Sequence, residues 1–217
     1  MSCFVAGTHK PLAGTANISK EKQSSFYQSD NKNHNSLTCI SGHQEKEKDF
    51  IAAVNAILNY LNRIDSSGLE KYIDKKTGIY IIGREGVFDR IYMDTNLYVY
   101  YHGTTLINYY KGLQFGKIQY SALPRYDCSS EKWSKQGTFV DTTNTDTMLS
   151  FTAKTLNKYG IGYLTAEDIS VMQKIESVSR RIVVANNKKQ SFVFYLSFIG
   201  KLWRLTIIDL VTDDCSA

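Results

Sequence analysis

The stretch between residues 191 and 211 constrains the fold most, because two runs of strand-forming residues flank the dipeptide Gly200-Lys201. A two-residue connection of this kind predicts a β-hairpin, and glycine at its first position favours a type II′ turn. The tight turn also predicts which residues face each other across the two strands. The expected pairs are Ile199 with Leu202, Phe198 with Trp203, Leu196 with Leu205 and Phe194 with Ile207.

One face of this predicted hairpin is almost wholly apolar, and the other is mixed. On the mixed face Ser197 is expected opposite Arg204 and Tyr195 opposite Thr206. That face therefore either lines a wet groove or lies under a thinner cover. A further strand over residues 182–186 precedes the hairpin, so a three-stranded antiparallel meander is predicted at the C-terminal end of the chain.

Three helices are predicted before this meander, each with an apolar stripe that should dock on the sheet. They span about residues 48–64, 145–159 and 165–179. The last begins at Thr165 and has Asp168 three residues later. In this capping-box pattern the hydroxyl satisfies a free amide, and the acid complements the helix dipole. The stripes consist of Ile51, Val54, Ile57, Leu58, Leu61 and Ile64; of Met148, Phe151, Thr152, Leu156 and Tyr159; and of Ile169, Met172, Ile175 and Val178.

The middle of the chain gives weaker signals. Strands are predicted over residues 79–83, 90–93, 97–101 and 115–120, a short helix over residues 105–110, and a long loop over residues 124–144 that Pro124 and Trp133 pin. The fold class follows from the order of the elements. An antiparallel sheet that ends in the meander, covered by an N-terminal helix and a mid-chain helix pair, is α+β rather than βαβ.

Residues 1–47 differ in composition from the rest of the chain. They contain three aromatic residues and the polar run QSSFYQSDNKNHNS, which cannot offset the entropy cost of ordering. The chain is therefore predicted to consist of a disordered polar tail over residues 1–47 and a single α+β domain over residues 48–217.

Charge, hydropathy and cysteine spacing exclude several classes of function. The net charge of +5 comes from basic residues scattered among acidic ones, so no nucleic-acid partner is expected. No apolar run reaches the roughly 18 residues of a membrane span, and the sequence shows no export signal. The four cysteines lack CxxC spacing and no cluster has metal-ligand spacing, so no metal and no other cofactor is expected.

The sharpest local motif is Tyr101-His102-Gly103-Thr104, followed by Lys111-Gly112-Leu113. It resembles the YHGT strand of ADP-ribosyltransferases of the diphtheria-toxin and PARP type. The resemblance covers the 13 residues from Tyr101 to Leu113. It implies that His102 and Thr104 hold the ribose and the amide of NAD.

A longer resemblance runs from about residue 48 to the C-terminus. Its most specific pieces are Tyr126-Asp127-Cys128 with Trp133, and the terminal Asp214-Cys215-Ser216-Ala217. With GIYIIGREGVFDR and the final hairpin, these segments are similar to an uncharacterised family of lipoproteins from Bacteroidota-type bacteria, whose helix-first order is loosely similar to NTF2-like domains. The resemblance implies a periplasmic or cell-envelope location. Cys39, before the tether HQEKEKD, sits where a lipidated cysteine could precede the domain.

Cys128 and Cys215 are the candidate disulfide. Each follows an aspartate in a polar connecting segment, whereas buried structural thiols more often lie inside apolar runs. If the protein is exported, as the family resemblance implies, both cysteines would be oxidised and would close a loop of about 87 residues. Reduced thiols are the alternative, because the sequence shows no export signal.

Two functions of different classes follow from these observations. The favoured one is a non-enzymatic, envelope-associated binding or structural module, with its ligand and partner open and no catalytic, cofactor-binding or metal-binding residue assigned. The alternative is an NAD-consuming, ADP-ribosyltransferase-like enzyme that uses the segment from Tyr101 to Thr104.

Overall fold

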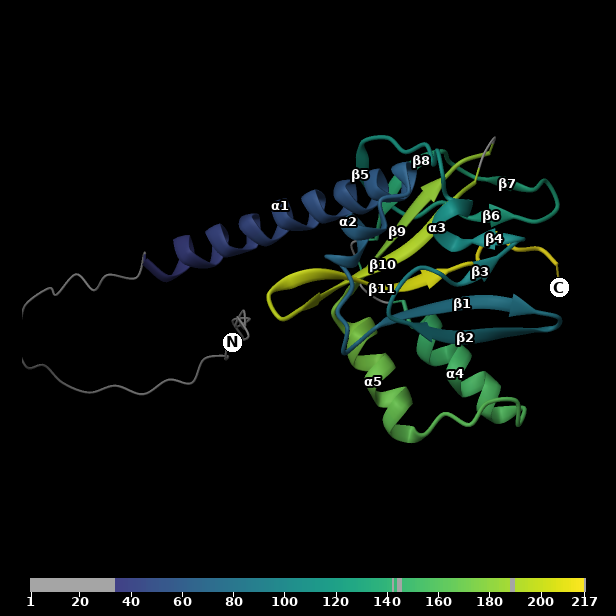
Figure 1. Cartoon of the computed structure of the whole chain (residues 1–217). Coiled ribbons are helices and arrows are strands. Elements are labelled where there is room, and N and C mark those ends of the chain that lie inside the picture. Colours follow the sequence, from purple (N-terminus) through teal and green to yellow (C-terminus); the bar gives the residue numbers. More distant parts are fainter. Residues whose placement is uncertain (1–33, 142, 144–145, 188–189, 217) are drawn as a thin grey trace, which may run out of the picture.

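The computed structural model describes residues 34–141, 143, 146–187 and 190–216. It confirms the α+β class: helices cover both faces of a seven-stranded sheet (Figure 1). The helices are α1 (His34–Arg63), α2 (Ser66–Glu70), α3 (Leu106–Tyr109), α4 (Met148–Lys158) and α5 (Ala166–Ser177). The strands are β1 (Ile79–Glu85), β2 (Phe88–Asp94), β3 (Tyr100–Tyr101), β4 (Thr104–Thr105), β5 (Ile118–Tyr120), β6 (Tyr126–Asp127), β7 (Lys132–Trp133), β8 (Gly137–Val140), β9 (Ser179–Ala185), β10 (Phe192–Ile199) and β11 (Leu202–Asp209).

The large sheet has the strand order β2, β1, β11, β10, β9, β8, β5. Its strands β9, β10 and β11 form the predicted C-terminal antiparallel meander. The sheet is mixed rather than antiparallel throughout, because β1 lies parallel to β11 and β5 lies parallel to β8. Pairing between strands so far apart in the chain depends on tertiary packing, which explains why the sequence did not indicate these two parallel neighbours.

The predicted hairpin register is confirmed near the turn and wrong beyond it. The four pairs from Ile199–Leu202 to Leu196–Leu205 are as expected. A bulge then lies between Tyr195 and Leu196, so that Tyr195 pairs with Ile207 and Phe194 with Ile208. Thr206 is the extra residue on β11, and the alternation of side chains does not reveal such an insertion.

The turn between β10 and β11 also differs from the prediction. Gly200 has a φ of 58° and Lys201 a φ of 69°. Positive φ at both central residues defines a type I′ turn, not the type II′ turn that glycine at the first position favoured.

The mixed face of the hairpin lies under a cover and is not a wet groove. Ser197 and Thr206 are fully buried. Their hydroxyls share a hydrogen bond of 2.6 Å, and Ser197 shares another of 2.6 Å with Ser179. Ser179 in turn donates to the carbonyl of Ile175 in α5 at 2.7 Å. The hydroxyl chain gives Ser179, Ser197 and Thr206 hydrogen-bond partners beneath α5.

Helix α1 covers the opposite face of the sheet and begins earlier than predicted. Its stripe packs Phe50, Val54 and Leu58 into the main core. The helix starts at His34 rather than near residue 48, so residues 34–47, which the sequence placed in a disordered tail, are helical. Residues 1–33 of that predicted tail lie outside the described residues.

The pair α4 and α5 packs on the other face, around Tyr80, Tyr195 and Ile207. The capping box of α5 is confirmed, with Asp168 N donating to Thr165 Oγ1 at 3.1 Å and Thr165 N donating to Asp168 Oδ2 at 2.8 Å. The apolar stripes predicted for α4 and α5 are partly wrong, because some of the large apolar side chains assigned to them are exposed at the surface. Phe151 and Tyr159 of α4 and Val178 after α5 are exposed, while Leu149 and Ala153 of α4 are buried instead.

Two segments of the middle third differ from the sequence-based assignment. The strand expected over residues 97–101 is reduced to β3, which pairs only with β4. The loop expected over residues 124–144 contains β6, β7 and β8, and β8 is a full member of the large sheet between β5 and β9. Trp133 does pin this region: it is buried, and its Nε1 donates to Ser191 Oγ at 2.7 Å.

Candidate functional site

A cleft lies where α3, the β3–β4 hairpin, the β6–β7 hairpin, the β9–β10 loop and the C-terminal segment meet. It consists of two hollows, of about 680 and 350 Å³. Both hollows are lined by Tyr109, Tyr126, Glu131 and Asp213. We call it the tyrosine cleft; its remaining lining residues are Tyr101, His102, Lys111, Gly112, Asn186, Asn187, Gln190, Ser191, Asp214, Cys215 and Ser216.

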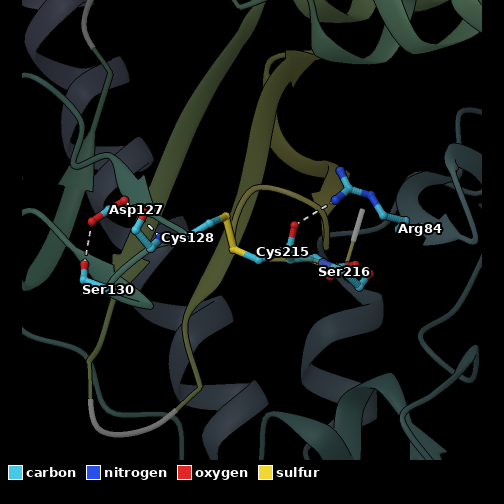
Figure 2. The surroundings of a disulfide bond; sticks show 8 residues. Arg84, Asp127, Cys128, Ser130, Cys215 and Ser216 are labelled. Carbon is cyan, nitrogen blue, oxygen red and sulfur yellow. Dashed lines mark hydrogen bonds between the residues drawn. A yellow bond between two sulfur atoms is a disulfide. The ribbon is translucent and has the colours of Figure 1, made fainter.

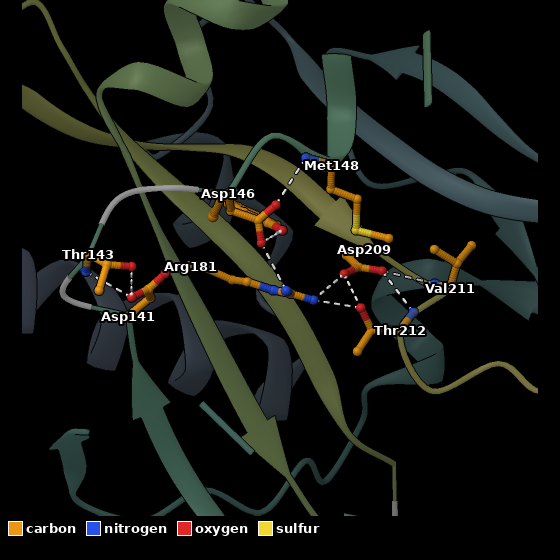
Figure 3. Close-up of polar contacts among 9 residues, drawn as sticks. Asp141, Thr143, Asp146, Met148, Arg181, Asp209, Val211 and Thr212 are labelled. Atoms are coloured by element: carbon orange, nitrogen blue, oxygen red, sulfur yellow. Dashed lines mark hydrogen bonds and ion pairs between the residues drawn. The ribbon is translucent and has the colours of Figure 1, made fainter. Parts of the chain in front are cut away.

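A buried ionic network holds the start of the C-terminal segment (Figure 3). Asp209, at the end of β11, is 1% exposed and accepts a hydrogen bond from Arg181 at 2.8 Å. Its other carboxylate oxygen accepts from the backbone amides of Val211 and Thr212, both at 3.0 Å. Arg181 also pairs with Asp146 at 2.8 Å. The turn after β11 is therefore fixed, which aims the next residues toward the cleft.

The rest of the C-terminal segment has two further tethers (Figure 2). Arg84 of β1 donates to the carbonyl oxygen of Asp214 at 2.8 Å. Cys215 is bonded to Cys128, with the two Cα atoms 5.6 Å apart. The disulfide predicted from the sequence is thus confirmed, and it joins two of the segments that line the cleft.

The β6–β7 hairpin forms the wall opposite α3. The ring of Tyr126 packs edge-on against Trp133, with 5.3 Å between ring centroids. Asn187 clamps Trp133 by accepting from its amide at 2.7 Å and donating to its carbonyl at 3.3 Å. Asp127 accepts from Ser130 Oγ at 2.6 Å and closes the loop that carries Cys128 and Glu131.

Aromatic rings from β3 and α3 form the other wall. Tyr109 contacts Tyr101 with centroids 5.0 Å apart and stacks on His102 with centroids 5.6 Å apart. His102 has a φ of 45°, and Glu131, across the cleft, has a φ of 52°. Two of the four non-glycine residues with positive φ in the described chain therefore line one cleft, and such residues concentrate at functional sites.

Asp213 gives the cleft a titratable carboxyl group near neutral pH. Burial, followed by the negative charges of Asp209 and Asp214, raises the pKa of Asp213 to about 6. Burial also raises the pKa values of Tyr101, Tyr109 and Tyr126, and the Asp213 charge raises them further. The phenols are therefore neutral at pH 7 and can donate hydrogen bonds to a ligand.

The Tyr101-His102-Gly103-Thr104 motif forms a tight hairpin turn rather than part of a long strand. His102 and Gly103, with φ values of 45° and 79°, connect β3 to β4 outside the seven-stranded sheet. Tyr101 and His102 line the tyrosine cleft, whereas Thr104 pairs with Tyr101 across the hairpin. Cys39 lies within α1.

Sequence reasoning missed Tyr109, Tyr126 and Asp213, the residues at the centre of the cleft. The high tyrosine content of the chain, 15 residues, was a general signal. The clustering of aspartates beside Cys215 was a local one. Neither signal indicates that these segments meet, because Tyr109 and Asp213 are about a hundred residues apart in the chain.

Among the described residues, no helix has both the length and the apolar character that a membrane span requires. In the same part of the chain, no group of three or more His, Cys, Asp or Glu side chains is placed to hold a metal ion. Comparisons with protein-family models, curated proteins and solved structures found no match for this chain.

Proposed function

We propose that this protein is a non-enzymatic binding module of the cell envelope and that its ligand occupies the tyrosine cleft. The observation that carries the proposal is the convergence of Tyr101, Tyr109 and Tyr126, from three separate elements, on two adjoining hollows. Ligand sites are concave, lie between structural elements and combine aromatic surface with a few polar groups. The tyrosine cleft has all three properties.

The frame of the cleft supports a binding role because it is rigid. Tyr109 contacts Tyr110 at 5.1 Å, and Tyr110 contacts Phe192 at 4.5 Å between ring centroids. This row of rings connects the cleft wall to the main core. A wall that is fixed before binding loses little conformational entropy when the ligand arrives.

The envelope location is supported by the disulfide. Disulfides persist in oxidising compartments such as the periplasm and are rare where glutathione and thioredoxin keep thiols reduced. Cys128 and Cys215 are both exposed, so a reducing compartment would have access to their bond. Thiol alkylation in intact cells, followed by mass spectrometry of the envelope fraction, tests the location; alkylation of both cysteines there would contradict it.

A thermal-shift screen of small polar and aromatic compounds tests the binding role. A ligand present at 100 times its dissociation constant adds about 2.7 kcal/mol to the free energy of unfolding, which raises the Tm by about 5–10 °C in a chain of this size. The shift should disappear in Tyr126→Ala. It should persist in Tyr163→Ala, a matched loss of a tyrosine that is 96% exposed between α4 and α5. A shift of equal size in all three proteins would place the ligand elsewhere.

The screen should also contain NAD, because the transferase alternative predicts a different outcome. A non-enzymatic binding module of the proposed kind should show no NAD binding that depends on His102. Saturable NAD binding that is lost in His102→Ala, with the circular dichroism spectrum unchanged, would favour the transferase and overturn this proposal.

A further inference from the structure

Among the described residues that line the tyrosine cleft, the charges are not balanced. These residues include the carboxylates of Glu131, Asp213 and Asp214 and one lysine, Lys111. The two arginines that hold the C-terminal segment are already engaged. Arg84 pairs with Asp89, and Arg181 pairs with Asp146 and Asp209. The described part of the lining therefore carries more carboxylates than ammonium groups.

Of the carboxylates that line the cleft, Asp213 is the one whose ionised form the surroundings disfavour most. Asp213 is only partly accessible to solvent, and the negative charges of Asp209 and Asp214 act on its carboxylate. Among the described residues, Asp213 has no ion-pair partner, and its carboxylate accepts a hydrogen bond from its own backbone amide. Placing a carboxylate in a partly desolvated site without a counter-charge is unfavourable, and a ligand that supplies positive charge removes that cost.

The aromatic walls favour the same kind of ligand. Tyr109 and Tyr126 line both hollows together with Asp213, and Tyr101 lines the smaller hollow. The face of a tyrosine ring attracts a cation through its quadrupole, and a cage of aromatic rings with one carboxylate suits an alkylated ammonium group. A neutral polyol would stack on the rings but would leave Asp213 without a counter-charge.

We propose that the tyrosine cleft binds an organic cation, with an ammonium group held between Tyr109 and Tyr126 and the carboxylate of Asp213 as its counter-ion. This inference rests on the proposed function, since it names the ligand class of the same cleft. The two hollows, of about 680 and 350 Å³, exceed the size of an ammonium group. The cation is therefore the recognised head of a larger molecule.

The test compares choline with 3,3-dimethylbutan-1-ol, which has the same shape but carbon in place of the charged nitrogen. Calorimetric titration at pH 7 should show choline binding at least about tenfold more tightly than the neutral alcohol, because only choline engages the carboxylate. Asp213→Asn should reduce that preference to about threefold or less. Glu167→Gln, which removes the same unit of charge from the start of α5 on the other face of the sheet, should leave it unchanged.

A second measurement on the unaltered protein guards against a folding defect in Asp213→Asn. Choline binding should weaken by about tenfold between pH 7 and pH 5, as Asp213 becomes protonated, while binding of the neutral alcohol should not change. The other groups that face Asp213 are Asp209, Asp214, Glu131, Lys111, His102 and the three tyrosines of the cleft.

The outcomes separate the ligand class from the proposed function. Choline and the neutral alcohol could bind equally well, or the neutral sugar cellobiose could bind while choline does not. If that binding is lost in Tyr126→Ala, the cation inference is overturned and the cleft remains a binding site. Absence of choline binding at 50-fold molar excess and millimolar protein would overturn the inference by itself. Choline binding that survives Tyr126→Ala and Asp213→Asn would contradict both proposals, because the ligand would then lie outside the cleft.

Discussion

Cys128 and Cys215 are covalently joined across 87 residues of sequence, with their Cα atoms 5.6 Å apart. The bond connects the β6–β7 hairpin to the segment after β11, so it ties together two walls of the tyrosine cleft (Figure 2). Neither wall belongs to the seven-stranded sheet. The disulfide is therefore the covalent element that fixes the cleft relative to the last strand.

Loss of this disulfide should destabilise the protein. Closing a loop of this length contributes about 4 kcal/mol in the chain-entropy model, so the double variant Cys128→Ser with Cys215→Ser should unfold at a clearly lower urea concentration. Reductant should lower the midpoint of the unaltered protein by a similar amount and have no effect on the double variant. A midpoint that reductant does not move would show that the bond is absent or that it constrains nothing.

Trp203→Ala should cost about 3–5 kcal/mol of the free energy of unfolding. Trp203 packs against Phe50 at 4.8 Å and Phe198 at 5.2 Å between ring centroids, and its Nε1 donates to the carbonyl of Lys46 at 3.1 Å. The neighbouring Arg204→Ala should cost about 1 kcal/mol or less, because Arg204 makes an exposed hydrogen bond to Lys71. Denaturant midpoints in the reverse order would contradict the observed register of the hairpin.

Arg181→Met should cost about 3–5 kcal/mol, because it leaves the carboxylate of Asp209 buried without its partner (Figure 3). Arg180→Met is the matched control. Its partner Glu47 has a side chain that is 29% exposed, so water compensates for the lost ion pair and the cost should be about 1 kcal/mol. Equal losses in chemical denaturation would show that the Arg181 network is not a buried ionic lock.

Asp213→Asn should stabilise the unliganded protein at pH 7 and have little effect at pH 4. The pKa of Asp213 is raised in the folded state to about 6, above its value near 3.9 in the unfolded chain. The folded protein therefore holds the proton more tightly, and stability falls as the pH rises from about 4 to about 6. Above that range the variant should gain about 1–2 kcal/mol, measured as the difference in Tm across pH. A difference that is constant with pH would contradict this assignment.

Truncation should locate the N-terminal limit of the folded unit. A chain that begins at Gln44 keeps the carbonyl of Lys46, which accepts from Trp203, and the carboxylate of Glu47, which pairs with Arg180. Its cooperative unfolding should be preserved. A chain that begins at Lys48 loses both contacts and should be less stable by about 1–2 kcal/mol. Equal stability of the two would restore the boundary near residue 48 that the sequence predicted.

The sequence by itself determined the features that depend on neighbours in the chain. The turn at Gly200-Lys201 brought Phe198 opposite Trp203, and the pattern from Thr165 to Asp168 placed the start of α5. The stripe around Val54 and Leu58 identified the buried face of α1. These features need only one turn of helix or one reversal of the chain, so local hydrogen bonds and side-chain periodicity specify them.

Only the tertiary structure decided the features that join distant segments. The parallel pairing of β1 with β11 and the insertion of the short strand β8 satisfy backbone groups whose partners lie far away in sequence. The cleft belongs to the same class, since Tyr109, Tyr126 and Asp213 come from three separate regions. Such contacts depend on how whole layers pack, and spacing along the chain carries no record of that packing.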